Sequence, residues 1–194
     1  SGLDAGPAEE CHRAMAAIPL PADDDLDPAT REHLAALPGL NVLRMVAHAP
    51  PCVQPFFDLG AALLLKAELP ARDRELAILR VAHLTRSAYE WHQHEIIGRA
   101  VGLTDADLDL ARRGASTDEL DSLLIAATDE ITTTVRLTDE TLAGLQRVLG
   151  NRQTVELILT VAHYNAVARL LESARVPIEE GWSLDPGEFA PDSG

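Results

Sequence analysis

The stretch ELAILRVAHLTRSAYEWHQHEIIGRAVG, residues 75–102, decides the fold. Its apolar residues recur three and four positions apart, which is typical of a helix with one buried face, and Gly102 is the kind of residue that follows a helix end. We therefore predict a helix over residues 87–101. The preceding segment, residues 72–84, is apolar on most sides, so we expect it to form a central, buried helix.

Helix start and stop signals recur through the rest of the chain. Asp27 precedes Pro28, a common pair at a helix start, and Thr104 with Asp107 has the pattern of a capping box. No segment shows the polar-apolar alternation of a half-buried strand. The sequence therefore predicts an all-α domain of about six to eight helices. Further helices are expected to start near residues 27, 41, 53 and 105 and to cover residues 116–134, 139–149 and 151–173.

The helical domain is predicted to cover residues 27–176 of the 194 residues, which is the length of one domain. Residues 1–26 are rich in proline, alanine and aspartate and are predicted to form an extended lead-in. The tail, residues 177–194, carries Trp182 and Phe189 among prolines and acids. We expect it to pack either over its own bundle or over a neighbouring subunit.

The composition limits the classes of partner. The 31 acidic and 16 basic residues give a net charge of -15, which argues against binding to nucleic acid or to anionic membranes. No apolar run approaches the roughly 18 residues of a membrane span, and no signal peptide is apparent. The two cysteines, Cys11 and Cys52, lie far apart and are interpreted as reduced thiols. We expect a cytoplasmic protein that binds a small molecule and copies of itself.

The helix predicted over residues 87–101 carries the chemistry. Glu90 and His94 are four residues apart, so their side chains stack on one face, the face that also carries Ile97. Gln93 lies on the same arc, which directs three polar groups toward the core. A carboxylate and an imidazole that are buried together are costly without partners, and such pairs gather where pKa values are tuned for proton transfer. Glu90 and His94 are therefore predicted to form an acid–base pair in mutual contact.

The longer string RDRELAILRVAHLTRSAYEWHQHEIIGRAVGLTDADL, residues 72–108, resembles the signature region of the carboxymuconolactone decarboxylase family. The superfamily of that family also holds the alkylhydroperoxidase-D-like proteins. The resemblance extends over about residues 40–176. It implies an all-helical domain that assembles into trimers, hexamers or related oligomers, with an active site at the start of the motif helix near a subunit boundary.

The redox branch of the family carries Cys-x-x-Cys, then a histidine four residues later, and a glutamate twelve residues before the first cysteine. By this resemblance the glutamate is Glu75 and the histidine is His94. The two cysteine positions hold Ser87 and Glu90, which cannot cycle between a dithiol and a disulfide. Peroxidase or disulfide-reductase activity is therefore disfavoured. The EW-x-x-H form that remains resembles hydrolytic, lyase or isomerase chemistry more than redox chemistry.

Each candidate also has a purely structural interpretation. Ser87 and Glu90 match a capping box, in which the glutamate reaches back to the serine amide. A histidine on an apolar face is commonly a satisfied core residue, and Glu75 could pair with Arg80 or Arg86 instead of serving a site. The direction of the pKa shift of Glu90 stays open, because a helix N-terminus lowers the pKa of a carboxyl group and burial raises it.

The histidines do not form an evident metal site. His92 and His94 diverge by about 200° on a helix and cannot bind one ion together. A metal would need Glu90 and His94 with further ligands from elsewhere, such as His83 or His163. We predict no metal and no cofactor.

The remaining candidates are substrate contacts. Gln93 and Tyr89 are predicted to supply hydrogen bonds, and His163 on the last helix is a further candidate. An anionic substrate would need local positive potential against the net charge of the chain. Three arginines are candidates for that role: Arg80, Arg86 and Arg169. If none of them lines the pocket, a neutral or apolar substrate is favoured.

These observations lead to a hypothesis of a cofactor-independent enzyme. Glu90 and His94 would move protons on a small carbonyl, lactone or carboxylic-acid compound, while Glu75 orients or relays. Decarboxylation, lactone opening, dehydration and cyclisation all fit this arrangement. The alternative is a non-catalytic binding or oligomeric relative in which the polar residues only cap a helix and specify the assembly.

Overall fold

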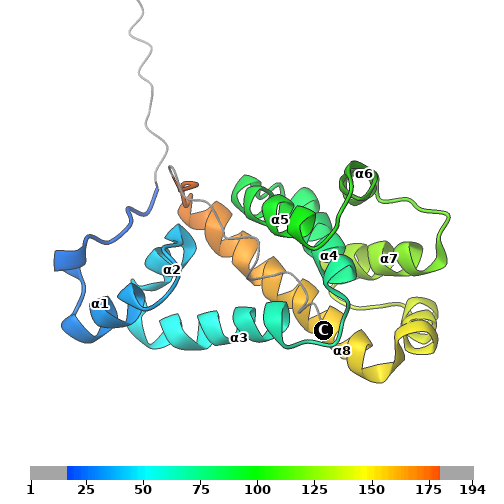
Figure 1. The fold of residues 1–194 in the computed structure, drawn as a ribbon, viewed down its shortest axis with the longest axis horizontal. Helices are drawn as coiled ribbons and strands as arrows, with labels where there is room; N and C mark the ends of the chain where they lie inside the picture. Colours follow the sequence, from blue (N-terminus) through cyan, green and yellow to red (C-terminus); the bar gives the residue numbers. More distant parts are fainter. Residues whose placement is uncertain (1–16, 180–194) are drawn as a thin grey trace, which may run out of the picture.

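The computed structural model describes residues 17–179 (Figure 1). Within that range the chain forms eight α-helices and two 3-10 segments and no strand, which confirms the all-α prediction for this part. None of these helices is both long enough and apolar enough to cross a bilayer. The elements are η1 Asp23–Asp25, α1 Pro28–Ala35, α2 Asn41–Val46, η2 Pro50–Cys52, α3 Val53–Leu65, α4 Ala71–Thr85, α5 Ala88–Ala100, α6 Asp105–Arg113, α7 Glu119–Thr134 and α8 Asp139–Ala174.

The caps of α1 and α6 lie where the sequence predicts them. The Asp27 carboxylate accepts from the backbone amides of Ala29 and Thr30 at the start of α1. Thr104 and Asp107 form the capping box of α6, in which each side chain accepts from the backbone amide of the other residue. These bonds satisfy amides that have no partner within the helix and so fix where each helix begins.

Helix α8 contains the break that the sequence predicts after Leu149. Gly150 has φ 74° and ψ 172°, which is not helical, so two helical segments meet there at a kink. A side chain with a Cβ rarely adopts this backbone conformation. The segment after the kink carries His163 and the buried Tyr164.

Helix α4 is the central element, as its apolar sequence predicts. All residues from 73 to 82 are buried, and the helix packs against α5, α6, α7 and α8. Charged side chains share this core with apolar ones, among them Arg74, Glu75 and Arg80. Each of them needs a partner inside the protein, because an unpaired buried charge is strongly destabilising.

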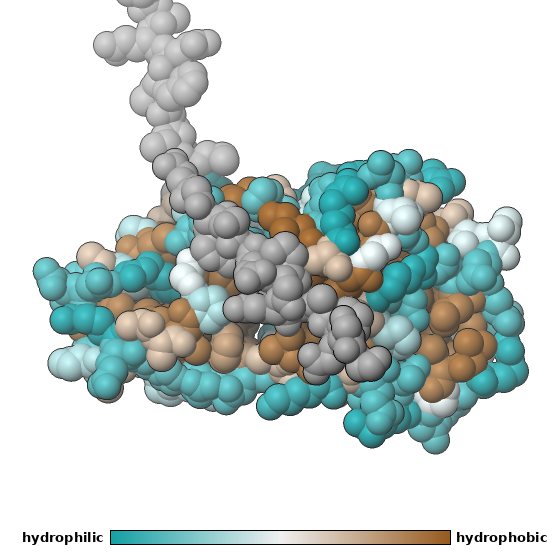
Figure 2. Space-filling model, viewed as in Figure 1, coloured by the Kyte–Doolittle hydropathy of each residue, from teal (hydrophilic) through white to brown (hydrophobic). Residues whose placement is uncertain are grey.

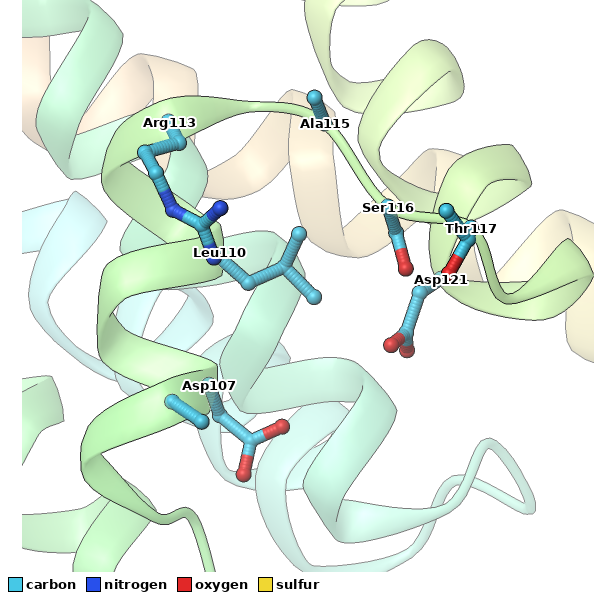
Figure 3. A pocket seen from close by; sticks show the side chains of 8 residues that line it. Asp107, Leu110, Arg113, Ala115, Ser116, Thr117 and Asp121 are labelled. Atoms are coloured by element: carbon cyan, nitrogen blue, oxygen red, sulfur yellow. The ribbon is translucent and has the colours of Figure 1, made fainter.

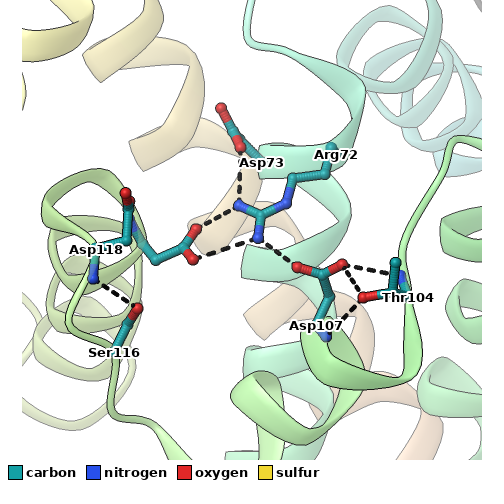
Figure 4. Close-up of polar contacts among 7 residues, drawn as sticks. Arg72, Asp73, Thr104, Asp107, Ser116 and Asp118 are labelled. Atoms are coloured by element: carbon teal, nitrogen blue, oxygen red, sulfur yellow. Dashed lines mark hydrogen bonds and ion pairs between the residues drawn. The ribbon is translucent and has the colours of Figure 1, made fainter.

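Arg72, at the start of α4, ties three helices together (Figure 4). Its guanidinium pairs with Asp107 of α6 and Asp121 of α7, and at 3.3 Å with the neighbouring Asp73. The two carboxylates raise the pKa of Arg72 well above its ordinary value. This cluster fixes α6 and α7 against the N-terminal end of α4.

Helices α1 to α3 form an arm that extends from one side of the bundle (Figure 1). Helix α3 packs on α8, and α2 packs on α3. The predicted lead-in is described only from residue 17, and it contains the short segment η1. The predicted tail is described only to Glu179, so Trp182 and Phe189 lie outside the described residues.

Candidate active site

A cavity of about 640 Å³ opens between the α1–α3 arm and the helices α5 and α8. This volume is in the range of small-molecule sites, roughly 300–1,000 Å³. Its walls are mainly apolar, and Figure 2 shows hydrophobic residues exposed among hydrophilic ones over the arm. The polar side chains that line it come from two helices: Tyr89, Glu90, Gln93 and His94 from α5, and His163 and Tyr164 from α8.

Helix α5 presents its polar residues as the helical periodicity predicts. Glu90, Gln93 and His94 are 2%, 6% and 6% exposed, and His92 and Arg99 on the opposite face are exposed. The inward polar face is therefore confirmed. All three inward side chains line the cavity.

The partner of His94 is Glu75 of α4. The Nδ1 atom of His94 lies 2.7 Å from Oε2 of Glu75, which is fully buried. Because a carboxylate only accepts hydrogen bonds, this contact places the histidine proton on Nδ1. The other ring nitrogen, Nε2, makes no hydrogen bond with residues 17–179 and is available as an acceptor.

Arg74 completes this chain of contacts. Its Nε donates to Oε1 of Glu75 at 3.0 Å, and both side chains are buried. Glu75 thus bridges a permanent cation and the imidazole of His94. The arginine was missed by the sequence analysis, which considered only Arg80 and Arg86 as structural partners of Glu75. The only signal for Arg74 was its place next to Glu75 in the sequence.

The predicted contact between Glu90 and His94 is wrong. No hydrogen bond joins them, and both carboxyl oxygens of Glu90 are buried without a hydrogen-bond partner in the described part of the chain. The capping box is also absent, since the Ser87 side chain caps no amide and its Oγ lacks a partner there too. Glu90 therefore lines the cavity as an unpaired carboxyl group and does not serve as a cap.

Burial decides the protonation of Glu90. Loss of solvent raises its pKa well above the ordinary value, and the charge of Glu172 adds to the rise. The sequence left the direction of the pKa shift of Glu90 open, and the structure shows that the pKa is raised. A carboxyl group with a raised pKa retains its proton at a pH where an exposed glutamate is ionised, and it can donate that proton or a hydrogen bond.

Two aromatic side chains of α8 complete the cavity wall near His94. The ring of Tyr164 meets that of His94 edge-on, with centroids 4.6 Å apart, and His163 lies 5.3 Å from Tyr164. Burial and the charge of Glu75 raise the pKa of Tyr164, so its hydroxyl keeps its proton. Burial and the nearby His94 lower the pKa of His163 to about 4. Tyr164 was missed because an aromatic residue on a long apolar helix indicates packing rather than a site.

None of the three candidate arginines lines the cavity. Arg80, predicted to bind substrate, instead forms two hydrogen bonds to Asp129, at 2.6 and 2.8 Å, and donates to the carbonyls of Ala111 and Arg112. Its guanidinium joins α4 to α6 and α7, so the structure places it in a structural role. Arg169 donates to Asn165 on its own helix.

Tyr89 and Gln93 line the cavity beside the acid–base residues. Both donate hydrogen bonds to the carboxylate of Glu179, that of Gln93 at 2.7 Å. His163 also lines the cavity. The positions of these three residues agree with a contact to a bound molecule, although their proposed role in binding substrate stays a prediction.

A second hollow, of about 420 Å³, lies along α6 and the loop before α7 (Figure 3). Two carboxylates line it, those of Asp107 and Asp121, and both are paired with Arg72. Across residues 17–179 no group of three or more histidine, cysteine, aspartate or glutamate side chains is arranged to hold a metal ion. The cavity at α5 and α8 is therefore the one that combines space with unpaired titratable groups in the described chain.

Comparison with known proteins gives a family match over part of the chain and a likeness of fold. Residues 50–131 match the carboxymuconolactone decarboxylase family. No curated protein sequence matches the chain. One similar solved structure is an alkylhydroperoxidase AhpD core, an uncharacterized peroxidase-related protein from Ralstonia eutropha JMP134, with a TM-score of 0.69 and 17% identity over 84% of this chain and 91% of that one. A second is an uncharacterized peroxidase-related protein from Silicibacter sp. TM1040, with a TM-score of 0.68 and 18% identity over 84% of this chain and 91% of that one. A third is a protein of unknown function from Agrobacterium tumefaciens, with a TM-score of 0.60 and 18% identity over 70% of this chain and 95% of that one. At these identities the likeness concerns the fold.

Proposed function

We propose that this chain, whose residues 50–131 match the carboxymuconolactone decarboxylase family, is a cofactor-independent acid–base enzyme. Its substrate class is a small carbonyl, lactone or carboxylic-acid compound. The observation that carries the proposal is that Glu90 and His94, two titratable groups with unused hydrogen-bonding capacity, line the same cavity.

His94 is the base in this proposal. Its Nδ1 is held by Glu75, so Nε2 carries the free lone pair of a side chain that lines the cavity. When Nε2 takes a proton from a carbon next to a carbonyl group or from water, the ring becomes a cation. The Glu75 carboxylate then stabilises that cation, as an acidic partner does for a catalytic histidine.

Glu90 is the acid. Its raised pKa favours the protonated carboxyl group, and neither oxygen is used by a neighbour among residues 17–179. It can therefore donate its proton to a carbonyl or lactone oxygen while His94 accepts a proton from the other side of the reacting group. Two groups with different environments on one helix face thus take opposite roles in proton transfer.

The cavity favours a mainly apolar substrate. Most of its wall is formed by aliphatic and aromatic side chains, and no lysine or arginine of the described chain lines it. A ligand with several negative charges would find no cation there, while the net charge of the chain is -15. We therefore propose a substrate that is neutral or carries a single acid group on an apolar body.

The test is an activity screen with three variants. Small lactones, β-keto acids and enolisable ketones are offered to the native protein, to Glu90→Gln and to His94→Asn. Loss of one acid or base is expected to lower turnover by about 10²- to 10⁴-fold. His92→Asn is the matched control, because it makes the same change on the exposed face of α5 and should keep native activity. Native turnover in the Glu90→Gln and His94→Asn variants would contradict the proposal.

The alternative is a binding protein without turnover. The unpaired Glu90 would then only hydrogen-bond to a ligand. In that case the screen yields compounds that raise the melting temperature of the native protein but are not converted. Peroxidase chemistry is the less favoured candidate, since Ser87 and Glu90 hold the positions of the redox cysteines and Cys52 is exposed on η2. Changing Cys52 to Ser should therefore remove no peroxide consumption.

A further inference from the structure

The carboxylate of Glu179, which follows the end of α8, is held by side chains of the cavity wall. One oxygen accepts from the Tyr89 hydroxyl and from the backbone amide of Asn41. The other oxygen accepts from Nε2 of Gln93 at 2.7 Å. Asn41 also donates from its side chain to the carbonyl of Pro177 at 3.0 Å, which fixes the segment that carries the carboxylate.

The two side-chain donors are built into the protein rather than placed on its surface. Tyr89 and Gln93 are 5% and 6% exposed, and both line the cavity. The Tyr89 oxygen accepts from the Val42 amide at 3.3 Å, which orients the hydroxyl. Burial and the charge of Glu179 raise the pKa of Tyr89, so the hydroxyl stays protonated and remains a donor.

These donors stand directly beside the acid–base residues. Tyr89 and Gln93 are one turn apart on α5, as are Glu90 and His94, and the two rows are adjacent on the helix. A molecule whose carboxylate rests on the first row would place its neighbouring carbons along the second row. All four side chains line the same cavity.

We propose that Tyr89 and Gln93 form a subsite for the carboxylate of an apolar monocarboxylic acid, and that Glu179 occupies this subsite from within the chain until such an acid displaces it. The identity of the acid as a substrate rests on the proposed function, whereas its binding does not. The neutral donors suit one carboxylate, in agreement with a cavity that has no cation in its described wall.

Competition between Glu179 and the ligand predicts the direction in which ligand affinity changes when Glu179 is altered. A tethered carboxylate competes at a high effective concentration, and the apparent dissociation constant is the intrinsic constant divided by the fraction of open molecules. Removing the charge of Glu179 should therefore tighten binding of a carboxylate. It should leave binding of an uncharged molecule of the same shape nearly unchanged.

The experiment measures binding by calorimetry with two probes of equal shape, phenylacetate and phenylacetamide, and it needs no turnover. Glu179→Gln is expected to bind phenylacetate about tenfold more tightly than the native chain, as is expected if the Glu179 carboxylate occupies the subsite about nine-tenths of the time. In the Glu179→Gln background, Tyr89→Phe should weaken phenylacetate binding by about tenfold, the effect of one hydrogen bond to a charged group. Phenylacetamide should change little in either variant.

Two outcomes would overturn the subsite. One is equal phenylacetate affinity in the native chain and in Glu179→Gln. The other is an equal gain in affinity for both probes in Glu179→Gln, which would indicate an opened cavity without carboxylate recognition. Melting temperatures of all variants are recorded, and Glu179→Gln, a change in a half-buried residue after the last helix, should melt only about 2–4 °C below the native chain because it loses only the contacts of Glu179. Because no step depends on catalysis, an inactive protein that shows the expected binding refutes only the proposed function.

Discussion

Glu90 is a buried carboxyl group that contributes no internal hydrogen bond to the described fold. Such a group normally costs free energy of folding, since its desolvation is not offset by a partner. Glu75 shows the contrasting case, because this fully buried carboxylate has a partner at each oxygen, Arg74 at one and His94 at the other. The two glutamates therefore differ in what they do for stability.

The pH dependence of stability should reveal Glu90. Its pKa is raised in the folded state, so between the ordinary pKa near 4.5 and the raised value the unfolded chain releases a proton that the folded chain keeps. Glu90 therefore makes the native protein lose stability as the pH rises through this window, by up to about 1.4 kcal/mol per pH unit. Glu90→Gln removes this loss, and its advantage in urea unfolding should grow from pH 4 to pH 7.

The control for this comparison is Glu32→Gln. Glu32 is exposed on α1, so the same chemical change there should give no advantage that grows with pH. If Glu90→Gln and the native protein kept a constant difference in unfolding free energy over the whole range, Glu90 would not have a raised pKa in the folded chain.

At the scale of helices, Arg80 explains how α4 is fixed to its neighbours. It joins Asp129 of α7 to two carbonyls at the end of α6. Gly114 follows that end with φ 70°, and a Cβ there would overlap the guanidinium. The glycine is thus required both for the left-handed backbone and for the space that Arg80 occupies.

Arg80→Met should therefore destabilise the protein without affecting the cavity. The change leaves Asp129 and two carbonyls without their donor, and we expect a loss of about 1–3 kcal/mol in urea unfolding. Arg113→Met, at an exposed arginine of α6, should change stability by less than about 0.5 kcal/mol. Phenylacetate affinity should be unchanged in both variants. A stable Arg80→Met protein with weakened binding would show instead that Arg80 contacts the ligand.

The features that the sequence predicts correctly belong to single helices, and those that it predicts wrongly depend on contacts between two helices. The periodicity within α5 correctly predicted that Glu90, Gln93 and His94 face inward, because that property depends on one helix alone. The partner of His94 lies on α4, and the partner of Arg80 lies 49 residues away in the sequence. Such pairings depend on how helices pack, so the sequence alone gave Glu90 a wrong partner and Arg80 a wrong role.

At the scale of the molecule, the net charge of -15 opposes the arrival of an anion at a cavity without a described cation. Salt screens this repulsion, since the Debye length falls from about 30 Å at 0.01 M to about 8 Å at 0.15 M. Assembly into a trimer or hexamer stays a prediction of the family resemblance.

Ionic strength should therefore affect the two probes differently. The association rate of phenylacetate, measured by stopped flow, is expected to rise by several-fold between 0.01 M and 0.15 M salt, as repulsion is screened. The rate for phenylacetamide should stay constant because it carries no charge. A phenylacetate rate that falls with salt would indicate that the cavity attracts anions, against the proposed substrate class.

The most direct test of the acid–base site is the protonation state of Glu90 itself. Carbon NMR of side-chain carboxyl groups, with Glu90 assigned by comparison with Glu90→Gln, reports whether that group carries a proton. Burial at 2% exposure without a described partner leads us to expect the chemical shift of a neutral carboxylic acid at pH 7. A Glu90 signal that titrates near pH 4.5, like an exposed glutamate, would contradict the account.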